Sequence, residues 1–206
     1  MPSAIASPGT HDPEYILAGS TLNMKEASAY TPHRESVLAA GKWLSQNGFF
    51  GTLRGTGGNV SQRIENRDVL AITPTSKRYD ELSPEDICVV DFNETRLAGS
   101  FPPSIELAMH IAAYRARPDA TAIVHTHSNY ASVFAVINRP VPVLCEEVLL
   151  NIGPRIEIVP FAPAGSRELA EKVAEKLQNG AWGFIIQNHG ALALGSTMDE
   201  ALLNAE

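Results

Sequence analysis

Cysteine, basic residues and long apolar runs are scarce in this sequence of 206 residues. It holds two cysteines, Cys88 and Cys145, and Cys88 lies in a strand-like apolar run, where a cysteine usually packs as a small buried residue rather than in a disulfide. A bilayer span needs about 20 apolar residues in succession, which the sequence lacks. The first residues also lack a basic flank before an apolar segment, so we expect no secretory signal, no membrane contact and a cytoplasmic protein.

The shortage of basic residues excludes one class of partner. Lysine and arginine number 16 against 23 aspartates and glutamates, which leaves a net charge of −7. Proteins that bind nucleic acids present basic surfaces to the phosphates, so we expect no nucleic-acid partner. The apolar fraction of 44% and the charged fraction of 19% are ordinary for a globular protein, and the length suits one domain with a sizeable core.

The chain divides into an arm and one domain. Residues 1–30 mix Ser, Ala, Pro, Gly and Thr without a sustained hydrophobic period, which is typical of a flexible N-terminal arm. The domain, residues 31–206, should open with a helix that Thr31 caps, with Pro32 at the first helical position.

Apolar runs alternate with helical patterns along this domain. Strands are expected over 69–73, 87–91, 122–127, 157–159, 182–187 and 191–194. Helices are expected over 104–117, 128–137 and 166–178, and a last one after Thr197. That helix has run barely two turns when the chain reaches Glu206, so we expect it to be incomplete.

Three histidines stand where strands end. His125 and His127 close an apolar strand, and because side chains alternate along a strand they project from the same face, about 7 Å apart along it. His189, in Asn188-His189-Gly190, follows the apolar run 182–187. A catalytic zinc site takes three protein ligands and leaves one position open. The three histidines supply such a set, although an isolated pair with this spacing is often incidental.

A carboxylate lies close to the histidine strand in the sequence. Ser104 can cap the helix that Pro118 ends, which places Glu106 in the first turn, where a glutamate often does no more than face the helix dipole. Its proximity to the histidine strand makes it a candidate acid/base group. His110 lies one turn further on the same helix face, where it could orient Glu106 or simply pack.

A glycine-rich turn offers an anion site. Gly58 and Asn59 precede a short strand, and glycines let backbone N–H groups approach a phosphate or carboxylate, to which Asn59 adds a side-chain donor. Thr75 and Ser76, after the next strand, could add hydroxyl donors to the same anion. Ordinary turn chemistry is the alternative for both segments.

These segments together resemble the class II aldolase/adducin family. The resemblance runs from about Thr31 to Glu206 and rests on five ordered motifs, which are Gly58-Asn59-Val60-Ser61, Thr73-Pro74-Thr75, Pro103-Ser104-Ile105-Glu106, His125-Thr126-His127 and Asn188-His189-Gly190. It implies a three-layer α/β/α sandwich around a mainly antiparallel central sheet. It also implies a homotetramer with active sites at subunit boundaries.

The resemblance implies roles for single residues as well. It makes His125, His127 and His189 the ligands of one Zn²⁺, or another divalent metal, per chain, and Glu106 the catalytic acid/base group. A pocket for a substrate phosphate would be formed by Gly58, Asn59, Thr75, Ser76 and Ser104.

Three positions depart from the pattern of the sugar-phosphate aldolases. Ile105 replaces the second serine of the family's Ser-Ser-Glu, and Ser76 stands where those enzymes have glycine. Glu146 falls where fuculose aldolases lend a tyrosine from a neighbouring subunit. The resemblance therefore predicts the scaffold and the metal more closely than the substrate.

The activity that the resemblance implies is that of a zinc-dependent lyase. The metal would stabilise an enediolate while a carbon–carbon bond breaks in a hydroxyketone or keto acid, phosphorylated or not, and Glu106 would move the proton. The same chemistry serves a decarboxylase, a sugar-phosphate dehydratase or a 4-epimerase. An adducin-like interaction module without metal is disfavoured, because all three histidines are present.

Overall fold

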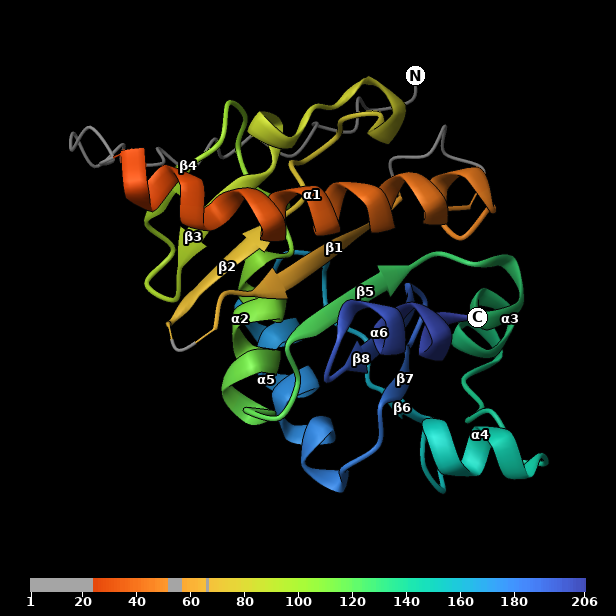
Figure 1. Ribbon diagram of the computed structural model, residues 1–206. Helices are drawn as coiled ribbons and strands as arrows, with labels where there is room; N and C mark the ends of the chain where they lie inside the picture. Colours follow the sequence, from red (N-terminus) through yellow and green to blue (C-terminus); the bar gives the residue numbers. More distant parts are fainter. Residues whose placement is uncertain (1–23, 52–56, 66) are drawn as a thin grey trace, which may run out of the picture.

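The computed structural model describes residues 24–51, 57–65 and 67–206, which form an α/β fold (Figure 1). The α-helices are α1 (Met24–Gln46), α2 (Leu107–Ala116), α3 (Asn129–Ile137), α4 (Glu146–Asn151), α5 (Arg167–Lys176) and α6 (Met198–Ala205). The strands are β1 (Gly58–Arg63), β2 (Val69–Ile72), β3 (Cys88–Asp91), β4 (Arg96–Ala98), β5 (Ala122–Thr126), β6 (Glu157–Val159), β7 (Gly183–Ile186) and β8 (Gly190–Gly195). Short 3-10 helices are η1 (Tyr79–Glu81), η2 (Pro84–Asp86) and η3 (Leu177–Asn179). Within these described ranges, no helix is both long and apolar enough to cross a membrane.

The strands join in one sheet, in the order β4-β3-β2-β1-β5-β8-β7-β6. We expected a mainly antiparallel sheet, but the sheet is mixed, because β6 pairs with β7 in parallel. The other neighbouring pairs of named strands are antiparallel. The parallel pair arises because α5 connects β6 to β7, and parallel neighbours need a crossover of this kind.

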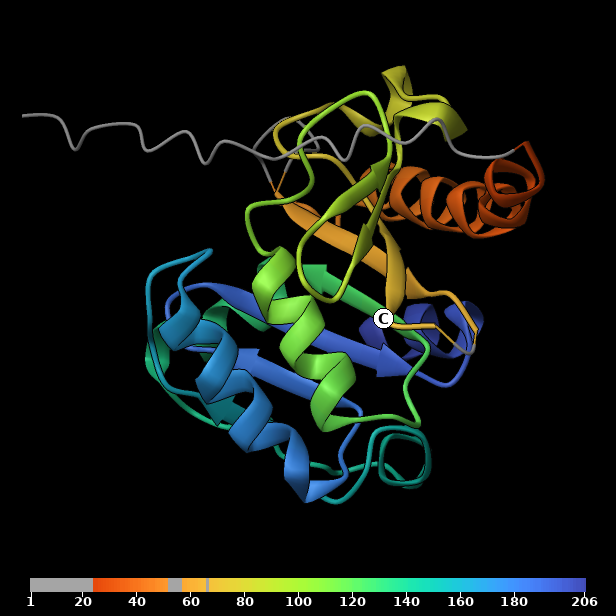
Figure 2. The same cartoon turned by 90° about the vertical axis from the view of Figure 1, so that its left-hand side faces the viewer.

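Helices cover both faces of the sheet, with α2 and α5 side by side on one of them (Figure 2). Side chains alternate along β5, so that Ile123 joins the apolar cluster of α2 and α5, whereas Ala122 and Val124 join the cluster of α1 and α6. β5 is buried along its whole length and is paired on both sides, with β1 and with β8. His125 lies on the same face of β5 as Ile123 and therefore points toward the α2 layer. Both neighbouring strands hold it in register.

The first helix begins earlier than the sequence indicates. We expected a start at Thr31, but α1 already includes Tyr30 and carries Pro32 inside it. A proline inside a helix removes one backbone hydrogen bond. Tyr30 is buried in a small apolar cluster against the sheet, so tertiary packing holds the turn before the proline. Residues 24–30 of the predicted arm are thus helical, and residues 1–23 lie outside the described part of the chain.

The second helix begins later than we expected. Ser104 does not cap it, because α2 starts at Leu107 with Glu106 at the capping position. Ser104 is held instead by its N–H, which donates to the Thr73 carbonyl at the end of β2 over 3.0 Å. Its hydroxyl accepts a hydrogen bond of 3.2 Å from the Glu106 N–H. Glu106 therefore lies in a turn tied to the sheet, just before the helix.

Candidate metal centre and active site

Two of the three histidines come from the end of β5. His125 is fully buried within the strand, and His127 follows its last residue. Their rings leave the sheet on the same side, as predicted from their spacing, and their Nε2 atoms lie 3.0 Å apart.

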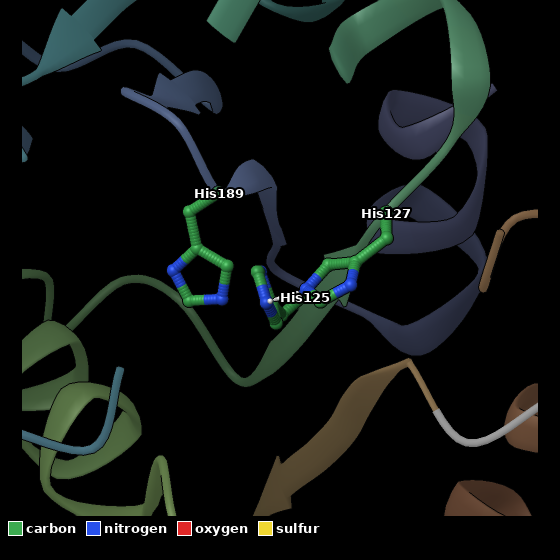
Figure 3. A group of neighbouring side chains, drawn as sticks. All are labelled: His125, His127 and His189. Carbon is green, nitrogen blue, oxygen red and sulfur yellow. Dashed lines mark hydrogen bonds between the residues drawn. The ribbon is translucent and has the colours of Figure 1, made fainter. Parts of the chain in front are cut away.

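His189 completes the group from the turn between β7 and β8 (Figure 3). Asn188 in this turn has a left-handed backbone with φ of 54°, which asparagine tolerates better than most residues. The centroid of the His189 ring lies 4.8 Å from that of His125 and 5.1 Å from that of His127. A side chain at Gly190 would collide with the Thr126 carbonyl and the His127 ring, so the turn needs glycine to bring the rings together.

Glu106 lies against this group of histidines. Its Oε2 atom is 3.1 Å from His125 Nε2, and its Oε1 atom is 3.4 Å from His189 Nε2. The residue is buried, because the turn before α2 covers the face of the sheet from which His125 projects. The structure therefore brings the predicted acid/base residue and the three predicted ligands together.

Burial and mutual charge set the pKa values in this group. Burial would raise the pKa of Glu106, but His125 beside it outweighs that effect and holds the pKa well below its usual range. Burial would lower the pKa of His125, but the Glu106 carboxylate raises it above the usual value. Burial, with the charge of His125 nearby, lowers the pKa values of His127 and His189 to about 4. At neutral pH Glu106 is therefore an anion, and His127 and His189 are neutral.

The three imidazoles could hold a metal ion. One nitrogen of each lies within 4.8 Å of the others. His125 Nδ1 lies 2.9 Å from the Ala191 carbonyl and donates its N–H there, which leaves Nε2 as the ligand atom, the usual orientation of a metal-binding histidine. In the described part of the chain, Glu106 Oε1, which faces His189 Nε2, is buried without a hydrogen-bond partner. A cation would satisfy imidazole nitrogens and a carboxylate that converge in this way.

A polar row supports Glu106 from inside the protein. Asn59 Nδ2 donates to Glu106 Oε2 over 2.8 Å, and Asn59 Oδ1 lies 2.5 Å from His110 Nε2. His110 Nδ1 lies 2.7 Å from the Ser61 hydroxyl, which in turn lies 2.8 Å from the Tyr114 hydroxyl. His110 therefore reaches Glu106 through Asn59, although the two residues share a helix face.

Sequence reasoning missed Ser61 and Tyr114 as members of this row. A signal was present, because Glu106, His110 and Tyr114 recur every four residues, and Asn59 and Ser61 are two apart on a strand. Each set therefore shares one face of its element. The pattern alone does not show that the two faces meet.

The residues of the predicted anion pocket lie on adjoining segments. Gly58 pairs with Thr126 at the end of β5, and with φ of 103° its backbone favours glycine. The Thr75 N–H donates to the Pro102 carbonyl over 3.1 Å, which sets Thr75 beside the segment that carries Ser104. Ser76 is exposed and has φ of 54°, a left-handed conformation that glycine adopts at lower cost. Residues 52–56 of the glycine-rich turn lie outside the described residues.

The two other departures from the family pattern are exposed. Ile105 is 59% exposed beside Glu106. Glu146 is the first residue of α4 and is exposed, so within one chain it stays outside the histidine group.

The sequence was compared with models of known protein families and with characterised proteins. The Class II Aldolase and Adducin N-terminal domain matches residues 35–206. An L-fuculose phosphate aldolase from Escherichia coli O6:H1 is 38% identical over 152 residues, which cover 74% of this chain and 69% of that protein. A 5-deoxy-D-ribulose 1-phosphate aldolase from Bacillus thuringiensis is 32% identical over 173 residues, covering 84% of this chain and 79% of that protein.

The fold is also that of a solved relative. An L-fuculose 1-phosphate aldolase superimposes with a TM-score of 0.78 at 30% identity, over 85% of this chain and 80% of that one. Sequence and fold agree over most of the chain, and the curated relatives are aldolases. The chain therefore belongs to the class II aldolase and adducin family and is an enzyme of the class II aldolase type.

Proposed function

We propose that the protein is a zinc-dependent lyase that cleaves a carbon–carbon bond of a phosphorylated hydroxyketone. One observation carries the proposal: the Glu106 carboxylate lies 3.1 Å from His125 Nε2 and 3.4 Å from His189 Nε2, within a group of three imidazoles. A carboxylate so placed can move a proton on a substrate held at the centre. The relatives named for fuculose phosphate and 5-deoxyribulose 1-phosphate support a sugar phosphate as the substrate class.

His125, His127 and His189 would hold one zinc ion per chain. Imidazole nitrogens suit zinc, and three of them leave one position for the substrate. When bound, zinc supplies a Lewis acid that stabilises negative charge on substrate oxygen atoms while the carbon–carbon bond breaks. His125 is the ligand with the best-defined orientation, because the Ala191 carbonyl accepts its Nδ1–H.

Glu106 would accept and return the proton. Asn59 donates to Oε2, whereas Oε1 has no hydrogen-bond donor among the described residues, so Oε1 is the atom open to a proton. In the cleavage direction, a base takes the proton from the hydroxyl group whose carbon becomes a carbonyl. The same carboxyl group can then protonate the carbon that the broken bond leaves with negative charge.

Gly58, Asn59, Thr75, Ser76 and Ser104 would form the phosphate pocket. The Thr75 and Ser76 hydroxyls lie 3.4 Å apart on a turn that is open to solvent, where both can donate to a phosphate. Asn59 has one N–H directed at Glu106, which leaves the second amide hydrogen for a substrate oxygen.

A homotetramer in which Glu146 reaches a neighbouring subunit's site is part of the proposal. The apolar side chains of Tyr130, Val136, Leu144 and Leu150, on and between α3 and α4, are 70% to 88% exposed. Exposed apolar groups on this scale are commonly covered by another subunit. Glu146 is the first residue of α4, next to this surface. If another subunit covers the surface, the Glu146 carboxylate lies at the boundary between the two subunits.

The proposal is tested by assaying zinc-loaded protein for cleavage of fuculose 1-phosphate and 5-deoxyribulose 1-phosphate. We expect a triose phosphate and an aldehyde as products, with both zinc and Glu106 required. Release of carbon dioxide from a keto acid, or of water from a sugar phosphate, would reassign the protein to a decarboxylase or a dehydratase. Protein that binds no zinc would favour the interaction module.

A further inference from the structure

We propose that His110 is a positioning residue that, held by Ser61, fixes the Asn59 amide with its NH₂ group toward Glu106. The carboxylate is thereby kept in place beside the histidine group. This inference rests on the proposed function, because that function gives Glu106 an orientation to keep. His110, Ser61 and Tyr114 act through Asn59 and have no role in contacting the substrate.

The row forms because the repeats of a helix and a strand match. Glu106, His110 and Tyr114 follow one another every four residues, an advance of about 6 Å per step along α2. Asn59 and Ser61 are two apart on β1, an advance of about 6.6 Å. The strand residues therefore fit between the helix residues, and the two sets alternate along the row.

Donors and acceptors in the row can be assigned outward from Glu106. A carboxylate only accepts, so Asn59 turns its NH₂ group toward Glu106 and its carbonyl toward His110. His110 then carries its proton on Nε2 and donates it to that carbonyl, which leaves Nδ1 to accept from the Ser61 hydroxyl. Ser61 accepts in turn from the Tyr114 hydroxyl over 2.8 Å, the shorter of the two contacts of that hydroxyl, since the Thr121 carbonyl lies 3.4 Å away. In each of these hydrogen bonds the donor hydrogen thus points toward the Glu106 end of the row.

The row is closed to water. Ser61, His110 and Tyr114 are fully buried, and Asn59 and Glu106 are 5% and 4% exposed. Burial lowers the pKa of His110 to about 3, so the ring is neutral and has a single N–H to donate. Without that N–H, the Asn59 amide could turn over and set its oxygen against Glu106, leaving two acceptors in contact with no proton between them.

If His110 only packed in the core, its hydrogen bonds to Asn59 and Ser61 would not affect turnover. Packing needs only the volume of the ring, and Tyr114 in the same layer belongs to the apolar cluster between α2 and the sheet. A buried polar row in such a layer is favourable only when all its members have partners, as they have here. Loss of packing lowers stability, whereas loss of orientation lowers turnover, so the two roles can be separated.

Two substitutions of His110 make this separation. His110→Leu keeps apolar bulk and removes both ring nitrogens, whereas His110→Gln keeps one donor for Asn59 and one acceptor for Ser61. In zinc-loaded protein with a sugar phosphate, we expect His110→Leu to lower kcat about ten- to a hundred-fold, the effect of one lost hydrogen bond at a charged group, with KM and zinc content nearly unchanged. His110→Gln should stay within about threefold of the wild type, since its amide has the donor and acceptor that the row needs.

Val90→Ala is the matched control for lost stability, because Val90 lies buried on β3, in the same apolar cluster but outside the row. It should lower Tm and leave kcat unchanged. Equal losses of kcat in His110→Leu and His110→Gln, in proportion to their losses of Tm, would overturn the proposal and reduce His110 to a packing residue.

A measurement without activity keeps the inference separate from the proposed function. We expect ¹⁵N NMR of histidine-labelled, metal-free protein to show His110 protonated on Nε2 and bare on Nδ1, with Ser61→Ala shifting the Nδ1 signal. A proton on Nδ1 in the wild type would reverse the donors and acceptors of the row at His110 and overturn the proposal. If the wild type cleaves no sugar phosphate, the proposed function fails, and these two nitrogen signals alone support or overturn the positioning of Asn59.

Discussion

Asn59 and His125 are cross-strand partners in the β1–β5 pair, and both meet the same oxygen of Glu106. Glu106 Oε2 lies 2.8 Å from Asn59 Nδ2 and 3.1 Å from His125 Nε2. The backbone ladder of two central strands thus sets the proposed base relative to a proposed ligand. A slip of one residue in that register would put the two side chains on opposite faces of the sheet.

We expect His127→Ala to lose tight zinc binding, because it removes one of three proposed ligands. Loss of even an outer partner of a ligand costs about 10- to 100-fold in metal affinity, so loss of a ligand should cost at least as much. His33→Ala, which removes a histidine of α1 outside the group, should keep zinc near one per chain. Metal analysis after dialysis decides, and stoichiometric zinc in His127→Ala would show the ligand assignment to be wrong.

Glu106→Gln should keep the fold and the zinc but lose turnover by about 10²- to 10⁴-fold, the usual contribution of a positioned acid or base. The amide fits the same space, yet it cannot take up and release a proton. Exchange of the proton at the substrate carbon measures this step directly. Exchange at the wild-type rate would exclude Glu106 as the base.

The histidine group could be predicted from the sequence because it depends on short-range geometry. His125 and His127 share a face by strand alternation, and the turn that carries His189 begins at Asn188, a residue type that tolerates a left-handed backbone. The structure confirms that the three rings meet. Their role as metal ligands stays a prediction until the metal is measured.

The polar row could not be predicted in the same way. Asn59 meets Glu106 because the turn before α2 packs against β1, a contact between distant parts of the chain that no local pattern specifies. The start of α1 has a similar explanation. Thr31 and Pro32 form a good local start signal, and the burial of Tyr30 against the sheet overrides it.

Metal-free protein should lose stability as the pH falls from 6.5 toward 4. His110, His127 and His189 have ordinary pKa values of 6.5 in an unfolded chain, whereas in the fold these pKa values are about 3, 4 and 4. In that interval the unfolded chain binds more protons than the folded protein does. The free energy of unfolding therefore falls by about 1.4 kcal/mol per pH unit for each extra proton that the unfolded chain binds. The raised pKa of His125 acts in the opposite sense at the upper end of the interval, where the unfolded chain begins to lose the proton that the folded protein keeps.

Urea unfolding of the metal-free protein at pH 7, 6 and 5 measures this slope. His110→Gln is the matched variant, because its amide keeps the hydrogen bonds of the row and cannot titrate. The fall in its free energy of unfolding per pH unit should be smaller by about 1.4 kcal/mol, the contribution of one proton. An unchanged slope would mean that His110 is protonated alike in the folded and unfolded states.

From Ile105 and Glu146 we expect only weak cleavage of fuculose 1-phosphate, and a preference for a substrate whose anion is smaller or differently placed. A phosphate loses one hydroxyl donor where the family's serine is replaced by Ile105, and hydrogen bonds to charged groups contribute about 1.5 to 3 kcal/mol each. That loss corresponds to about one to two decades of affinity. A Glu146 carboxylate that reached a neighbouring subunit's site would also repel a dianionic substrate.

Ile105→Ser combined with Glu146→Tyr should therefore raise kcat/KM for fuculose 1-phosphate by about ten- to a hundred-fold, the value of the restored donor. Ile105 is 59% exposed, so serine should be accepted there without loss of core packing. Leu203→Ser, which makes a similar exchange at an exposed position of α6, is the control and should leave kcat/KM unchanged. Efficient cleavage of fuculose 1-phosphate by the unmodified protein, with no gain in the double variant, would overturn this interpretation of both positions and make fuculose 1-phosphate itself the better substrate assignment.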